Sequence, residues 1–170
     1  KKYYEAISDY SKVIQLNPKL ANPYLYRGKA YQYVKQNEKA LADFEQAIEL
    51  NPNNASGYYF RARLRQDLSE PDGAVEDYTE AISINAGYGS AYRERGELYA
   101  SKLQFSKALS DFDKVLSLNP HDARIYARRG DVLMRMGNFA KAEEDVKEAI
   151  KLDPRNQSYQ DLLALITKEQ

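Results

Sequence analysis

The chain has 170 residues, of which 25 are Lys or Arg and 25 are Asp or Glu, so its formal net charge is zero. Domains that bind nucleic acid usually carry a basic excess, and this balance therefore argues against that class of partner. The chain has no cysteine and a single histidine, which excludes disulfides and thiolate zinc sites and disfavours histidine-based metal or triad chemistry.

Taken in chain order, apolar and small residues recur at helical spacing and predict ten helices and no strand. Proline occurs at Pro18, Pro52, Pro120 and Pro154, which sets a period of 34 residues with Ala86 in the remaining slot. The expected helices cover about 2–15, 21–34, 37–50, 55–68, 71–84, 89–102, 105–118, 123–136, 139–152 and 158–168.

Each repeating unit contains two helices, which we call helix A and helix B. Helix A opens with Tyr and has a small residue four positions later, as in Tyr24 and Gly28. Helix B has an alanine followed four residues later by an aromatic or Val, as in Ala40 and Phe44. The Asn of the pairs Asn17-Pro18, Asn51-Pro52 and Asn119-Pro120 is expected to take the left-handed conformation that ends a helix, and Pro cannot continue one. Pro71 suits the first turn of a helix B.

These residues resemble the tetratricopeptide repeat, whose pattern is Trp-x2-Leu-Gly-x2-Tyr, then Ala-x3-Phe, then Pro. The resemblance covers essentially the whole chain. It implies an all-α, right-handed superhelical solenoid of antiparallel helix pairs, with the A helices on the concave side. It divides one array into a half repeat at 1–18 that holds only helix B, full repeats at 21–54, 55–88, 89–122 and 123–156, and a capping helix at 157–170.

The sequence departs from the family pattern at several positions. Tyr replaces Trp at every opening position. The pair at 55–88 has Ala62 for Gly, Arg65 for Tyr and Ala86 for Pro, so we expect it to be the least stable pair.

One departure recurs in every full repeat, because arginine replaces the leucine that precedes the small residue of helix A. An aspartate also precedes each aromatic position of helix B, and the two series predict a ladder of ion pairs between helices. Because the aspartates lie on the stripe that faces the following repeat in this family, we expect the pairs Asp9–Arg27, Asp43–Arg61, Asp77–Arg95 and Asp111–Arg129. The alternative register joins each arginine to the aspartate 16 residues later in its own repeat.

Positions of helix A that the packing does not need are candidates for a peptide-binding groove. They are aromatic in the N-terminal half and charged in the C-terminal half, and such residues often dominate binding energy. We expect Tyr59 and Phe60 to anchor an apolar end of a ligand, and Arg63, Arg93 and Arg128 to orient an acidic end. The alternative is that the rings are core and the arginines pair with Glu94, Glu97 and Asp131. The groove set is Tyr26, Lys29, Tyr33, Tyr59, Phe60, Arg63, Arg93, Glu97, Arg124 and Arg128.

Part of the family holds acidic C-terminal tails in a clamp of Lys, Asn and Arg. In the last three pairs only basic residues such as Arg63 and Arg124 match, and Glu94 would repel a carboxylate where Asn should donate, so we expect no clamp. His121 is expected to be a solvated turn residue. Asn54 and Asn156 match a glycosylation sequon, but both also stand where a helix needs a cap.

The function that these patterns favour is a non-catalytic module that binds another protein or a peptide, without cofactor, metal or nucleic acid. Two alternatives stay open: a scaffold that self-associates through the N-terminal edge, where Tyr3, Ile7, Tyr10 and Ile14 form an apolar stripe, and the repeat arm of a larger enzyme. Apolar runs are too short to insert into a membrane, and the cytoplasm is the favoured compartment.

Overall fold

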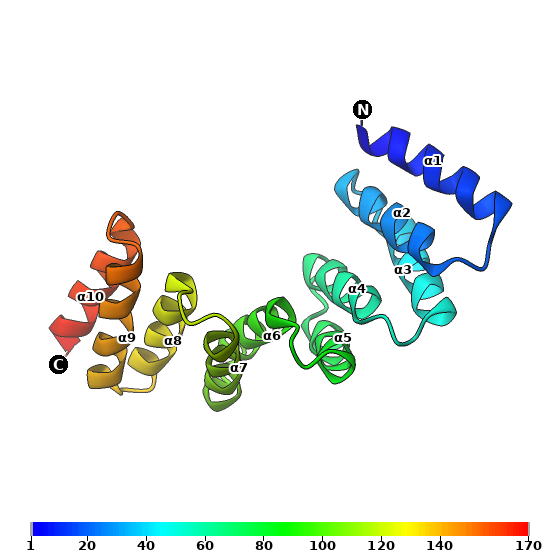
Figure 1. Ribbon diagram of the computed structural model, residues 1–170. Coiled ribbons are helices and arrows are strands. Elements are labelled where there is room, and N and C mark those ends of the chain that lie inside the picture. Colours follow the sequence, from blue (N-terminus) through cyan, green and yellow to red (C-terminus); the bar gives the residue numbers. More distant parts are fainter. Residues whose placement is uncertain (1, 170) are drawn as a thin grey trace. The chain divides into compact units, whose positions relative to one another are not determined.

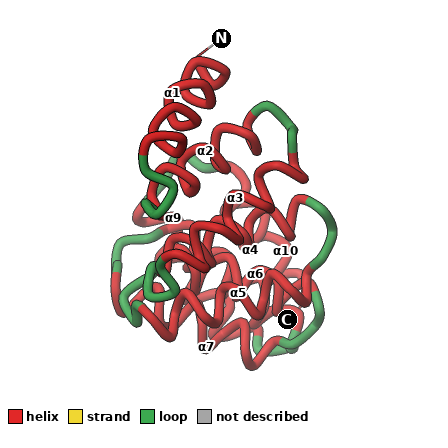
Figure 2. Tube along the Cα trace, turned by 90° about the vertical axis from the view of Figure 1, so that its right-hand side faces the viewer, coloured by secondary structure: helices red, strands yellow, loops and turns green. Residues whose placement is uncertain are grey.

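The computed structural model describes residues 2–169, and within that range it contains ten α-helices and no strand (Figures 1 and 2). The expected all-α class and the number of helices are therefore confirmed. The helices are α1 (Lys2–Leu16), α2 (Ala21–Tyr33), α3 (Asn37–Leu50), α4 (Ala55–Asp67), α5 (Pro71–Ile84), α6 (Gly89–Ser101), α7 (Phe105–Leu118), α8 (Ala123–Arg135), α9 (Phe139–Leu152) and α10 (Gln157–Glu169).

The chain divides into two compact units, with the boundary in the sequence between Tyr88 and Gly89. The N-terminal unit holds α1 to α5, with α2 packed on α3 and α4 on α5. The C-terminal unit holds α6 to α10, with α6 packed on α7, α8 on α9, and α10 on α9. Short turns join the helices of each pair, which makes neighbouring helices antiparallel (Figure 1).

Small residues let the two helices of a pair approach closely. A methyl group added to Gly28 would lie 2.8 Å from the ring of Phe44, and one added to Gly96 would lie 2.8 Å from the ring of Phe112. Both rings are fully buried. The helix B aromatic therefore fills the space that the glycine leaves open, which explains why the two positions recur together.

The left-handed residue of each repeat lies in the turn from helix A to helix B. Residues 35, 69, 103 and 137 all have positive φ, for example 60° at Lys35 and 77° at Gly137. The amide of Gln36 then donates to the carbonyl of Tyr31 at 2.9 Å, which closes the end of helix A as in a Schellman motif.

The expectation of a left-handed Asn was wrong, since Asn51 and Asn119 have φ of −146° and −140°. Both residues precede a proline, and the proline ring favours an extended conformation in the residue before it. Asn85 is also extended, although Ala86 follows it.

The pair α4–α5 compensates for its departures from the repeat pattern. Arg65, which replaces Tyr, donates to Asp77 at 2.9 Å and to the carbonyl of Gly73 at 3.2 Å. The hydroxyl of Tyr78 donates to Gln66 at 3.0 Å. The polar groups of Arg65, Tyr78 and Gln66 therefore all have hydrogen-bond partners within the pair.

The first and last helices differ in how much they bury. No side chain of α1 is buried, and its Asp9 is 76% exposed beside Lys12. In α10, Ile166 is fully buried, and Tyr159, Leu162 and Leu163 pack against the same cluster as Val146. The C-terminal helix is thus anchored by an apolar face.

Candidate functional site

One arginine–aspartate pair joins the two helices of each full repeat, in a register that corrects our expectation. In the first, Arg27 donates from Nε and Nη2 to the two carboxylate oxygens of Asp43 at 2.8 and 2.7 Å. The corresponding bonds join Arg61 to Asp77, Arg95 to Asp111 and Arg129 to Asp145. Every arginine thus binds the aspartate 16 residues later, and the predicted pairs Asp9–Arg27, Asp43–Arg61, Asp77–Arg95 and Asp111–Arg129 were wrong.

The reason for this register is the close packing within a pair. The aspartate lies one residue before the ring that fills the space beside the helix A glycine, so it reaches the arginine one residue before that same glycine. The hydrogen bond to Asp43 raises the pKa of Arg27, and equivalent bonds raise the pKa of the other three arginines. The aspartates are buried and the arginines are partly buried, so these pairs join the two helices of each repeat.

Tyrosines complete each joint, which explains why the chain uses them so regularly. The guanidinium of Arg27 lies 5.6 Å from the ring centre of Tyr24 and 5.8 Å from that of Tyr31. Arg95 lies 5.7 Å from the rings of both Tyr92 and Tyr99. Rings at these positions therefore supply cation–π contacts to the buried charge.

The rings expected to line the groove in the N-terminal unit do not all reach its surface. Tyr26 is 44% exposed and Tyr33 is 63% exposed. Tyr59 is only 8% exposed, and its ring lies 5.7 Å from that of Tyr78 and 4.9 Å from that of Tyr88. The expectation that Tyr59 offers a free anchor is therefore wrong, because these contacts hold its ring in the core. Phe60 is partly buried beside Phe44.

The two exposed rings of α2 are held in place by α1. Tyr26 stacks on Tyr10 with ring centres 5.8 Å apart, and Tyr33 stacks on Tyr3 at 4.5 Å with an angle of 11°. Each ring thus keeps one face against a neighbour while part of it stays open to solvent. Such preorganised rings lose little conformational entropy when a partner binds.

A hollow of about 220 Å³ lies between α2 and α4 in the N-terminal unit. We call it the basic hollow, because three of its seven residues are cationic and one is acidic. Lys29 and Arg63 hold equivalent positions in successive A helices, and the turn residue Lys35 was not predicted. The lining residues are Lys29, Gln32, Tyr33, Lys35, Phe60, Arg63 and Asp67.

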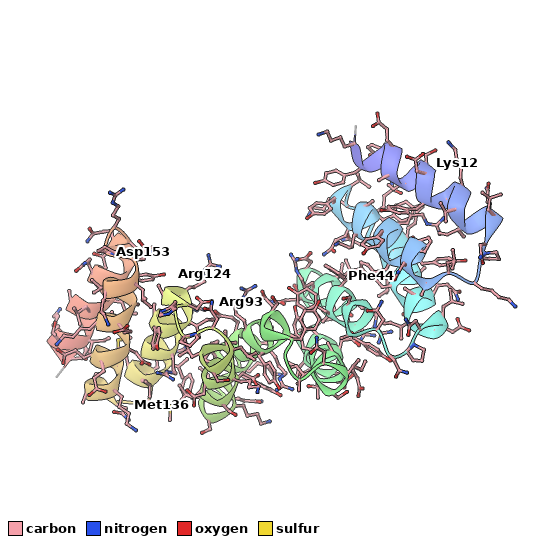
Figure 3. The ribbon with its side chains drawn as sticks, viewed as in Figure 1. Lys12, Phe44, Arg93, Arg124, Met136 and Asp153 are labelled. Atoms are coloured by element: carbon pink, nitrogen blue, oxygen red, sulfur yellow. The ribbon has the colours of Figure 1, made fainter. Side chains whose placement is uncertain are left out.

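In the C-terminal unit, the charges on the A helices neutralise one another. Arg93 bonds Glu94 at 2.9 Å, and Arg128 forms a bidentate ion pair with Glu97, which raises the pKa of Arg128. This is the arrangement that our alternative interpretation described. Arg124 is exposed and lines a shallow hollow together with Arg93 and Asp153 (Figure 3).

Other candidate features have structural explanations. Asn54 accepts a hydrogen bond from the amide of Ser56 at 3.1 Å, and Asn156 accepts one from Ser158 at 3.2 Å, so both cap helices. His121 is exposed in the turn before α8. Within residues 2–169, no cluster of three or more His, Asp or Glu side chains could hold a metal ion, and no helix is long and apolar enough to cross a membrane.

Comparison with known protein families identifies repeats in the same part of the chain. Three models described as tetratricopeptide repeat cover residues 21–54, 55–88 and 99–166. The chain belongs to the tetratricopeptide repeat family. Proteins of this family are typically protein-interaction modules and are generally non-catalytic scaffolds. No curated protein matches the sequence of this repeat protein.

Similar solved structures are also tetratricopeptide repeat proteins. MamA is 25% identical with a TM-score of 0.83, and the match covers 92% of each chain. YrrB, described as having an unusual peptide-binding site, is 24% identical with a TM-score of 0.79, and the match covers 99% of this chain and 84% of YrrB. A repeat protein from Parabacteroides merdae is 21% identical with a TM-score of 0.84, and the match covers 98% of this chain and 66% of the other.

Proposed function

We propose that this chain is a binding module that holds an extended peptide or a partner helix against its A helices. This proposal rests on one observation: the side chains that join the helices differ from the side chains that are exposed on the A helices. The residues of the repeat pattern are used in joints between helices, whereas Tyr26, Tyr33 and Arg63 stay exposed on the A helices. Exposed rings beside an Arg are the residue types that dominate binding at protein interfaces.

The description of YrrB as a peptide-binding repeat protein supports this proposal by analogy. The buried Tyr59 limits the site in the N-terminal unit to the remaining rings. Arg93 and Arg128 are paired with Glu94 and Glu97, so the A helices of the C-terminal unit offer a ligand less uncompensated charge than those of the N-terminal unit. We therefore place the main contact on α2 and α4.

Quantitative affinity capture from an extract of the source cells tests the proposal with two matched variants. Tyr26→Ala removes an exposed ring from α2, and Tyr4→Ala removes a ring that is 59% exposed on α1. We expect Tyr26→Ala to lower the amount of bound partner about tenfold or more. Tyr4→Ala should bind like the wild type, and circular dichroism should show that both variants are folded. Equal capture by Tyr26→Ala and wild type would contradict the proposal.

Self-association through α1 is a second candidate function. Tyr3 and Tyr10 of the expected apolar stripe stack on Tyr33 and Tyr26 of α2, so the expectation that this stripe is open was wrong for those rings. Val13 of α1 is 38% exposed, however, whereas Ala47, its equivalent in α3, is buried. Exposed apolar stripes of this kind often mark contact surfaces. Sedimentation equilibrium of the wild type and of Val13→Glu would test it. A monomer at every concentration would exclude this second function.

A further inference from the structure

The basic hollow is lined by more cationic than acidic side chains. Lys29, Lys35 and Arg63 face one carboxylate, that of Asp67, in a space of about 220 Å³. Asp67 lies four residues after Arg63 on α4, which is the spacing of a helical ion pair. Instead, Asp67 accepts a hydrogen bond from Gln32 at 2.9 Å.

None of the three cations of the hollow has an ion pair with any residue in the described range 2–169. This contrasts with the C-terminal unit, where Glu97 occupies the position equivalent to Arg63 and binds Arg128. Cations grouped without a counter-charge create a positive potential that attracts an anion. The hollow therefore suits a ligand group with negative charge.

Aromatic rings form the other side of the hollow. The Nζ of Lys29 lies 4.2 Å from the ring centre of Phe60 and 5.5 Å from that of Tyr26. This position fixes the ammonium group over Phe60 while its N–H groups can still donate to an anion. Tyr33 is fixed by its stack on Tyr3. The charged group of the ligand must therefore lie close to an apolar one.

We infer that the basic hollow binds the side-chain carboxylate of an Asp or Glu in a partner peptide that has apolar residues nearby. This inference rests on the proposed function. Arg63 and Lys29 hold the carboxylate, and Phe60 and Tyr33 contact the adjacent apolar side chain. Arginine suits this role because its fork of N–H donors matches the two oxygens of a carboxylate.

The exposed ring of Tyr26 indicates that the peptide continues along α2 beyond the hollow. Tyr26 and Tyr33 are two helical turns apart, or about 10 Å at the rise of an α-helix. An extended peptide covers that distance in about three residues. The favoured ligand therefore has a second apolar residue about three to four positions from the one that contacts Tyr33, with the acidic residue between the two.

Fluorescence polarisation with the full chain and three labelled, C-terminally amidated peptides tests this inference. The first peptide is Leu-Ala-Ala-Glu-Phe, the second has Gln in place of Glu, and the third has phosphoserine there. We expect the Glu peptide to bind wild type about tenfold more tightly than the Gln peptide. Increasing salt should weaken this preference, because Lys35 and Arg63 are exposed to solvent.

Two charge-reversal variants provide the controls. Arg63→Glu should abolish the preference for Glu over Gln, whereas Lys19→Glu should keep it. Lys19 is also exposed, but it lies in the turn before α2, about 20 Å from Tyr33 at the helical rise. Circular dichroism should show equal helix content in both variants. Equal binding of the Glu and Gln peptides to wild type, or an unchanged preference in Arg63→Glu, would overturn the inference.

A clear preference for the phosphoserine peptide would also overturn it, because the hollow would then be a phosphate site. The affinity capture with Tyr26→Ala separates this inference from the proposed function. If the Glu preference is absent but Tyr26→Ala still loses its partner, the carboxylate site is wrong and the binding module stands. If Arg63→Glu leaves the peptide preference unchanged and Tyr26→Ala captures as much partner as the wild type, both proposals are wrong.

Discussion

Asp43 is nearly buried, and its charge is stabilised mainly by Arg27. The two side chains share two hydrogen bonds, and the carboxylate is 7% exposed. Replacing Arg27 by Ala leaves this carboxylate buried without a counter-charge. We expect Arg27→Ala to lower the free energy of unfolding by about 3 kcal/mol, measured by urea denaturation.

Double-mutant cycles distinguish the observed register from the one that the sequence suggested. We expect Arg27→Ala and Asp43→Ala to show a coupling energy of about 2 kcal/mol, because the residues are in direct contact. Arg27→Ala and Asp9→Ala should show almost none, since Asp9 lies exposed beside Lys12. Coupling of Arg27 to Asp9 but not to Asp43 would mean that the register described here is incorrect.

At the residue scale, the sequence predicted the four arginines and four of the five aspartates of the ladder, but it wrongly included Asp9 and gave the wrong pairing. Each of the four ladder arginines lies 18 residues after one aspartate and 16 residues before another, so the spacing alone allows two registers. Which register forms depends on how closely the two helices of one pair pack, and the spacing of residues in the sequence does not give that distance. The ion pair of Arg128 with Glu97 belongs to the alternative interpretation of the groove, and spacing could not decide for it because 31 residues separate the two side chains and several acidic side chains were available.

At the element scale, the turns from helix A to helix B share one strained backbone position. Leu103 has φ of 58° and a side chain that is 64% exposed, whereas the equivalent Gly137 has φ of 77° and no neighbour that a Cβ would meet. A left-handed conformation costs a residue with a side chain about 1–2 kcal/mol, and glycine avoids most of that cost. Glycine also loses more entropy on folding, which offsets part of the gain.

We therefore expect Leu103→Gly to raise the free energy of unfolding by about 0.5 kcal/mol and Gly137→Ala to lower it by about 1 kcal/mol, measured by urea denaturation. Leu118→Gly is the matched control, because Leu118 is also exposed but ends α7 in helical conformation. That variant should be destabilised by about 1 kcal/mol. A loss of stability in Leu103→Gly equal to that of Leu118→Gly would contradict the explanation from backbone strain.

Helix positions followed closely from the sequence, because turn residues mark both ends of each helix. The expected 37–50, 71–84 and 105–118 agree with α3, α5 and α7. The location of the left-handed residue did not follow, since three of the four positions hold Lys, Ser or Leu rather than Gly or Asn. Such residues give no local indication of positive φ, and the conformation is imposed by the bonds that close helix A.

At the scale of the whole molecule, the two compact units bury their outermost helices to different extents. In a repeat protein, stability is roughly a sum of the stability of each repeat and of the contacts between neighbours. The C-terminal unit closes with α10, whose Ile166 is fully buried, whereas the N-terminal unit includes α1, which buries no side chain. The N-terminal unit also contains the pair α4–α5, which departs most from the repeat pattern.

We expect residues 89–170 expressed alone to unfold cooperatively, with a higher Tm than residues 1–88 expressed alone. The cut between Tyr88 and Gly89 keeps the contact of Tyr88 with Tyr59 within one fragment. Thermal circular dichroism of both fragments measures the difference, and Ile166→Ala in the C-terminal fragment is the control. That change removes a buried anchor and should cost about 2–5 kcal/mol, which would bring the Tm of the C-terminal fragment toward that of the other. An N-terminal fragment with an equal or higher Tm would show that the uncovered face of α1 does not limit the stability of this unit.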